Sequence, residues 1–194
     1  PDSTGGVATR REARHINGYA PGPATPTAGE PMSQAPHSGP TRAIDRYFAS
    51  YSADHRHPLN QRIHVVAVPA ILWSVVALVW CVPVFGTWTR TGIWAALAMF
   101  AAWSFYNRLS RRLGLGMLAL FFFCGCVCRL IEMRLGPGVL LAAAAAVFVF
   151  AWVAQFVGHH YEGRRPSFLT DLVYLLIGPA WVMAKCYRRL GWRY

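Results

Sequence analysis

The sequence predicts an all-α membrane protein, a polytopic helical bundle, from three observations. The chain of 194 residues is 55% hydrophobic and 14% charged, which is about half the charged fraction of an average soluble domain. Its apolar residues are gathered in long runs, several of which approach the ~20 residues needed to cross a ~30 Å hydrocarbon core. Side chains that can carry out chemistry stand at the ends of these runs, where the chain leaves the membrane.

The first part of the chain, residues 1–41, has the composition of a disordered tail. It holds seven of the thirteen Pro and six of the seventeen Gly, with almost no large apolar residue. Such a segment cannot bury enough surface to offset the entropy lost on ordering. We therefore expect the membrane-embedded helical domain to comprise residues 42–194.

A short amphipathic helix is predicted at the start of this domain. Apolar side chains recur at helical spacing at Ile44, Tyr47, Phe48 and Tyr51. A helix with one apolar face suits the surface of a membrane.

Four transmembrane helices are expected at 63–85, 91–107, 112–129 and 135–158. The first and the last are long enough to span the bilayer. The middle two are short, but Arg side chains at their ends can snorkel, and the short turn "NRLSRR" joins them as a helical hairpin. A fifth apolar segment, 168–187, is interrupted by "GPAW" and is expected to be an interfacial or re-entrant helix.

Arginine placement predicts the orientation of these spans. If the first span begins in the cytoplasm, nine Arg of the span-flanking segments lie inside and three lie outside, as the positive-inside rule requires. Eighteen Arg against one Lys suggest a bacterial gene, so we expect a bacterial inner-membrane protein. The net charge of +11 is explained by span ends facing anionic lipid, and no nucleic-acid partner is needed.

Two polar motifs then meet the same, cytoplasmic, membrane face. In "HRHPLNQRIH", Pro58 suits the first turn of a helix, which places Asn60 and His64 on one helical face with His55 just before it. In "QFVGHHYEGRR", the residues Gln155, His159 and Glu162 form one stripe, whereas His160 points about 100° away from His159.

Imidazoles and a carboxylate near one membrane face suit a divalent first-row metal. In that case Asn60 and Gln155 would fix the tautomers of bound His rings, and Arg164 or Arg165 would bind a substrate carboxylate. The plainer alternatives are that the His residues are interfacial, that Glu162 is half of an ion pair, and that the two Arg are a positive collar. The run "CGCVC" lies inside a helix, where Cys usually acts as a small apolar residue.

The two motifs resemble those of the membrane family typified by the fungal endoplasmic-reticulum 2-hydroxy fatty acid dioxygenase. The resemblance covers about residues 44–186 and rests on His55, Pro58, Asn60, His64 and Pro69, followed by "QFVGH", "E-x-R-R-P" and "DL". It implies a small multi-helix membrane protein that shortens a 2-hydroxy fatty acid by one carbon with Fe(II) and O2. It also implies that His55, His64 and His159 bind the iron and that Glu162 belongs to the catalytic site. The spacing of three between His159 and Glu162 departs from the family pattern, so the role of Glu162 stays open.

Other functions are compatible with the residues alone. A desaturase-like diiron oxygenase would need more His, in paired boxes, and an external electron donor. A membrane scaffold or transporter would use the polar clusters only as span caps. Membrane lipid is a partner in every case, and a homo-oligomer is left open.

Overall fold

The computed structural model describes residues 42–84, 91–163 and 173–194, which belong to one unit of the chain, residues 40–194. These residues form helices and no strand: α1 (Ala43–Ala53), α2 (Pro58–Trp80), α3 (Ile93–Leu109), α4 (Arg111–Leu135), α5 (Pro137–Glu162) and α6 (Val173–Arg189). The predicted tail at 1–41 and residues 168–172 of the predicted C-terminal helix lie outside the described residues.

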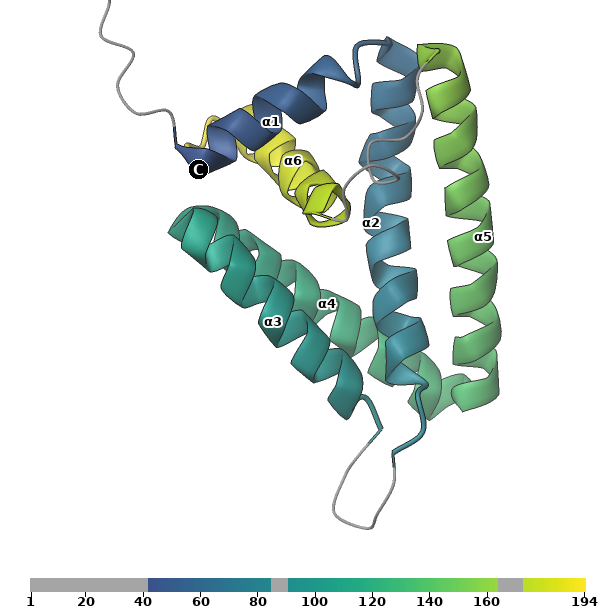
Figure 1. The fold of residues 1–194 in the computed structure, drawn as a ribbon. Helices are drawn as coiled ribbons and strands as arrows, with labels where there is room; N and C mark the ends of the chain where they lie inside the picture. The colour runs from purple at the N-terminus through teal and green to yellow at the C-terminus, as the bar shows by residue number, and fades with distance from the viewer. Residues whose placement is uncertain (1–41, 85–90, 164–172) are drawn as a thin grey trace, which may run out of the picture. The chain divides into compact units, whose positions relative to one another are not determined.

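The helices are arranged around two antiparallel pairs. Helix α2 packs along α5, and α3 packs along α4 (Figure 1). Helix α1 leads into the start of α2 and packs on α6, which also contacts α2 and α4. The N-terminal end of α2 therefore lies beside the C-terminal end of α5.

Three of the described helices, α2, α4 and α5, are long and apolar enough to cross a membrane. Their outward faces carry large apolar side chains that are mostly exposed, such as Val66 at 73%, Phe122 at 75% and Phe150 at 74%. An exposed apolar surface of this extent is typical of a lipid-facing protein. Helix α3 has 17 residues, so the fourth crossing stays a prediction.

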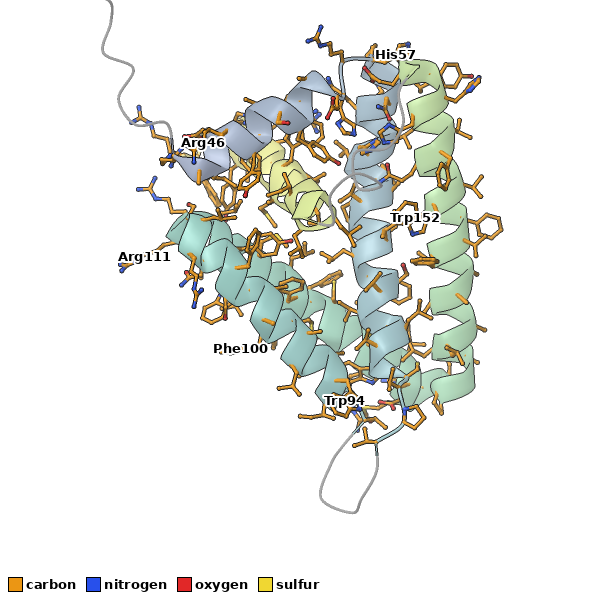
Figure 2. The ribbon with its side chains drawn as sticks, in the orientation of Figure 1. Arg46, His57, Trp94, Phe100, Arg111 and Trp152 are labelled. Carbon is orange, nitrogen blue, oxygen red and sulfur yellow. The ribbon has the colours of Figure 1, made fainter. Side chains whose placement is uncertain are left out.

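Three labelled side chains mark the two ends of the hairpin of α3 and α4. Figure 2 places Arg46 and Arg111 toward the end that carries α1, and Trp94 at the opposite end of α3.

The helix boundaries differ from the predicted spans for local reasons. Helix α2 begins at Pro58 and ends at Trp80 instead of 85, and Pro83 follows the end, as is common after a helix. Helix α4 continues past 129 to Leu135, and its last turns contain an ion pair between Arg129 and Glu132 at 2.9 Å. Helix α5 runs four residues past 158 to Glu162 and is terminated by Gly163, whose φ of 69° favours glycine.

The amphipathic helix α1 forms as predicted, but protein rather than membrane covers its apolar face. The side chains of Ile44, Phe48 and Tyr51 are buried in a core with Trp181 of α6. The indole Nε1 of Trp181 donates a hydrogen bond to Ser52 Oγ at 2.9 Å. The period of the apolar residues predicted the helix, whereas the identity of its partner depended on where α6 folds back.

Helix α6 is continuous through the "GPAW" segment. Proline inside a helix costs about 3 kcal/mol because it removes one backbone hydrogen bond. Here Ile177, Ala180 and Trp181 are buried next to it, and Tyr106 Oη donates to the carbonyl of Leu176 at 2.8 Å. Burial of these side chains offsets the cost of the proline.

The contact between α2 and α5 depends on a glycine at the polar end. A Cβ added to Gly158 would lie 2.5 Å from Oδ1 of Asn60, a side chain that is fully buried. Glycine therefore lets the two helices approach where the sequence motifs meet.

We expect Gly158→Ala to destabilise the protein by about 1–3 kcal/mol, because overpacking forces the helices apart. Thermal unfolding in detergent micelles measures this, with Gly138→Ala as the matched control, since no atom lies within 4 Å of a Cβ at Gly138. An unfolding temperature for Gly158→Ala that equals that of the control would contradict the proposed close contact.

Candidate metal centre

Three buried histidines from distant parts of the chain meet at the joined ends of α2 and α5. His55 lies in the linker between α1 and α2, His64 lies in the second turn of α2, and His159 lies in the last turn of α5. Their exposed fractions are 1%, 1% and 4%. Each offers one ring nitrogen within 4.8 Å of the others, and among the described residues this is the group able to share a metal ion.

Backbone carbonyls determine the tautomers of two of these rings. The Nδ1 of His55 lies 2.6 Å from the carbonyl oxygen of Tyr51, and the Nδ1 of His64 lies 2.9 Å from that of Asn60. A carbonyl can only accept, so both Nδ1 atoms carry the proton and donate. Burial lowers the pKa of His55, although its hydrogen bond to Tyr51 opposes the shift. In the neutral rings the Nε2 atoms hold the lone pairs that a metal binds.

These two lone pairs face each other. The Nε2 atoms of His55 and His64 are 3.1 Å apart, yet in these tautomers neither has a proton to donate. Two imidazole nitrogens that bind one ion at ~2.1 Å lie about 3.0–3.4 Å apart. The pair therefore fits a shared cation.

His159 completes the group. Its ring centroid is 5.1 Å from that of His55 and 5.0 Å from that of His64. Its Nδ1 is buried and has no hydrogen-bond partner among the described residues, and burying such a nitrogen unsatisfied costs about 1–3 kcal/mol. One ring nitrogen of His159 lies within 4.8 Å of a nitrogen of each of the other two rings, so the three rings together are consistent with a metal site.

An outer layer of side chains holds His55 in place. The ring of Tyr51 stacks on the His55 ring at 4.1 Å. Gln61 Nε2 donates to the His55 carbonyl at 2.8 Å, and Lys185 Nζ donates to Gln61 Oε1 at 2.8 Å. Lys185 also lies 3.8 Å above the Trp181 ring, and burial lowers the pKa of its ammonium. Helix α6 thus helps to position His55 through Lys185 and Gln61.

Glu162 and Asn60 lie next to the histidines but contact each other. Asn60 Nδ2 donates to Glu162 Oε2 at 3.0 Å, and the other two partners of this carboxylate are backbone N–H groups of Arg56 and His57. Asn60 is predicted to fix the tautomer of a His ring. Its backbone carbonyl does this for His64, whereas its side chain binds Glu162.

The other predicted site residues are placed as follows. Gln155 is 6% exposed and lines a cavity one turn before His159. His160 is exposed, which agrees with a helical phase about 100° away from His159. Arg164 and Arg165 lie outside the described residues.

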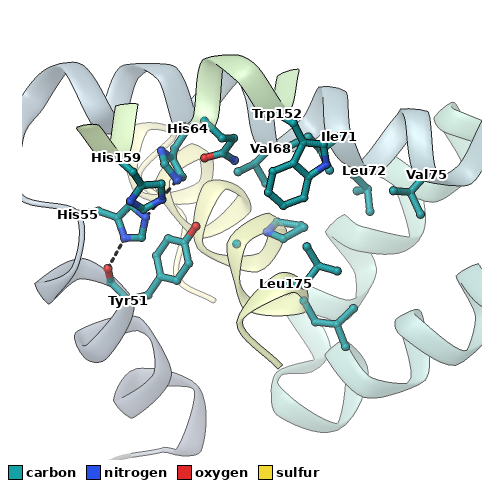
Figure 3. Close-up of a pocket in the computed structure, with 14 residues that line it drawn as sticks. Tyr51, His55, His64, Val68, Ile71, Leu72, Val75, Trp152, His159 and Leu175 are labelled. Carbon is teal, nitrogen blue, oxygen red and sulfur yellow. Dashed lines mark hydrogen bonds between the residues drawn. The ribbon is translucent and has the colours of Figure 1, made fainter. Parts of the chain in front are cut away.

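The histidines form the polar end of an apolar cavity of about 140 Å³. Figure 3 shows the three rings and Tyr51 at one end, with Val68, Ile71, Leu72 and Val75 of α2 extending away from them. Trp152 of α5, which lies between α2 and α5 in Figure 2, and Leu175 of α6 close other sides. The cavity can hold a molecule with a polar head and an apolar tail.

Sequence reasoning did not assign Tyr51, Gln61 or Lys185 to the site. Tyr51 was interpreted only as part of an apolar face, and its carbonyl and ring act through the folded linker. Lys185 did carry a signal, because it is the single Lys beside eighteen Arg.

The apolar helices and the buried His group define a helical membrane protein with a site suited to a divalent metal. A family model described as 2-hydroxy-palmitic acid dioxygenase Mpo1-like matches residues 41–190, and the chain belongs to this family. It is 28% identical over 145 residues to the Saccharomyces cerevisiae protein named 2-hydroxy-palmitic acid dioxygenase MPO1, covering 73% of this chain and 78% of the yeast protein. No solved structure matches the chain.

We expect the purified protein to bind a divalent first-row metal and His64→Ala to weaken this binding by at least about 100-fold, the upper range for loss of an outer-shell partner. Titration of metal-stripped protein with Co(II), followed by its visible absorption, measures the affinity. His160→Ala is the control, because this neighbour of His159 is exposed. Equal affinities for the two variants would exclude His64 as a ligand.

Proposed function

We propose that this protein is an Fe(II)-dependent dioxygenase that shortens 2-hydroxy fatty acids by one carbon in lipid or sphingoid-base catabolism. Membership of the family supports the reaction class. The observation that carries the metal proposal is the 3.1 Å approach of two ring nitrogens whose lone pairs converge beside His159 in a buried site. Imidazole is a suitable ligand for iron, and three His leave positions open for substrate and O2.

The reaction balances without a further cofactor. A 2-hydroxy acid, R–CHOH–COOH, reacts with O2 to give R–COOH, CO2 and H2O. The bond between C1 and C2 breaks, the substrate loses four electrons, and O2 accepts them. When bound, Fe(II) supplies electron transfer to O2 and a positive centre for the oxygens of the 2-hydroxy acid.

The residues of the chain provide ligands, orientation and exclusion of water. His55, His64 and His159 would hold the ion, with the first two rings oriented by the carbonyls of Tyr51 and Asn60. Gln155 faces the same cavity, and its amide can hydrogen-bond to the hydroxyl or the carboxylate of the substrate. Arg164 or Arg165 would compensate the carboxylate charge. The apolar wall excludes water and accepts the acyl chain.

We also propose that the protein lies in a bacterial inner membrane with this site on the cytoplasmic face. The excess of Arg in the segments flanking that face supports this orientation. A 2-hydroxy acid dissolved in the bilayer can then enter from the apolar side while its head group stays at the interface.

The direct test is turnover of 2-hydroxypalmitate by the iron-loaded full chain. We expect O2 uptake, with one O2 consumed for each fatty acid formed with one carbon fewer, identified by mass spectrometry. His64→Ala and His159→Ala remove metal ligands and should lose activity by at least about 10²-fold, whereas His160→Ala should keep it. Metal-free wild-type protein, or full activity in the two ligand variants, would contradict the proposal and favour a scaffold or transporter.

The length of the cavity predicts a preference for long chains. From His64 to Val75, α2 rises about 16 Å at ~1.5 Å per residue, and Val75 at the far end is 39% exposed. Val75→Trp should lower kcat/KM for 2-hydroxypalmitate about tenfold by obstructing the chain, with little effect on 2-hydroxyoctanoate. Val66→Trp is the control, because Val66 is 73% exposed and does not line the cavity. An equal loss for both substrates would show that the chain does not follow this wall.

A further inference from the structure

The carboxylate of Glu162 is bound by the start of α2. Its Oε1 accepts a hydrogen bond from the backbone N–H of Arg56 at 2.7 Å. Its Oε2 accepts from the backbone N–H of His57 at 2.9 Å and from Asn60 Nδ2 at 3.0 Å. Both oxygens therefore accept hydrogen bonds from a segment more than one hundred residues away in sequence. The group of described residues that can share an ion consists of the three histidines and does not include Glu162.

This arrangement is a helix cap supplied by another helix. His57 is the N-cap of α2, so Asn60 is the third residue of the helix. In a capping box the side chain at that third position, usually Glu or Gln, accepts from the N–H of the N-cap residue. Here Asn60 donates instead, and Glu162 of α5 accepts from the N-cap. The negative carboxylate also lies at the positive end of the α2 dipole.

The cap connects two of the histidines. His55 directly precedes Arg56 and His57, whose N–H groups Glu162 holds. His159 lies three residues before Glu162 on the same helix. A single carboxylate therefore ties the His55 linker to the end of α5, where the third ring lies.

We propose that Glu162 is a positioning residue, which fastens residues 55–57 to α5 and thereby brings His55 to His64 and His159. The geometry of this cap is independent of the proposed function, but its purpose in the metal centre rests on that function. Glu162 then acts through His55, without contact to the metal or the substrate.

The first measurement is amide hydrogen exchange in the metal-free full chain, resolved to single residues in detergent micelles. Glu162→Gln keeps the size of the side chain but replaces one accepting oxygen by an N–H₂ donor that opposes the donors at α2. We expect the amides of Arg56 and His57 to exchange about tenfold faster or more in this variant. Glu132→Gln is the control, because Glu132 pairs with Arg129 and Trp80 away from the histidines.

The second measurement is Co(II) affinity, which we expect to fall about 10–100-fold in Glu162→Gln, as for other outer-shell partners. Glu162→Asp keeps the charge but is one methylene too short to reach both N–H groups, so its exchange rate and affinity should lie between those of wild type and Glu162→Gln. This variant also serves if Glu162→Gln does not fold.

The results separate positioning from chemistry. Unchanged protection of Arg56 and His57 would overturn the proposed cap. Loss of turnover with unchanged protection and Co(II) affinity would instead make Glu162 a catalytic residue. If wild-type protein shows the protected amides but neither binds iron nor turns over a 2-hydroxy acid, the proposed function fails while the cap stands.

Discussion

The antiparallel contact between the start of α2 and the end of α5 is the constraint on which the rest of the structure depends. It is close because Gly158 has no side chain where Asn60 is buried. On this contact Glu162 reaches the N-terminus of α2, and His64 reaches His159. A wider separation of the two helices would disrupt both the cap and the ring cluster, because both bridge the same pair of helix ends.

The site concentrates polar groups in a protein whose described helices are largely apolar. Burying an imidazole without a partner is unfavourable, and the fold limits this cost by using backbone carbonyls as acceptors for His55 and His64. The carbonyls bind the protons on the outer nitrogens and direct the lone pairs inward. His159 Nδ1 has no hydrogen-bond partner among the described residues, so the cost of burying this ring is not offset in the same way.

Helix α6 links this centre to the remainder of the bundle. Lys185 supports His55 through Gln61, Trp181 ties α6 to α1, and Tyr106 ties it to α3. The same helix lines the apolar cavity with Leu175 and Pro179. A movement of α6 would therefore alter both the position of the first histidine and the space available to an acyl chain.

Local patterns in the sequence determined the helices, their approximate ends, and the candidate residues. Apolar runs and the Pro58 start signal led to α2, and helical phase separated buried His159 from exposed His160. Such features depend on neighbours within a few residues, so one chain is sufficient to infer them. Span counting predicted that both motifs meet one face of the membrane, but it could not bring them into contact.

The tertiary structure decided the contacts that join distant segments. Three features depend on which surfaces meet. They are the packing of α6 on α1, the continuity of α6 through Pro179, and the capping of α2 by Glu162. The tautomers of His55 and His64 likewise follow from carbonyl positions in the folded chain. Residue identity and spacing show which groups can donate or accept, whereas only packing determines which partner lies within hydrogen-bond distance.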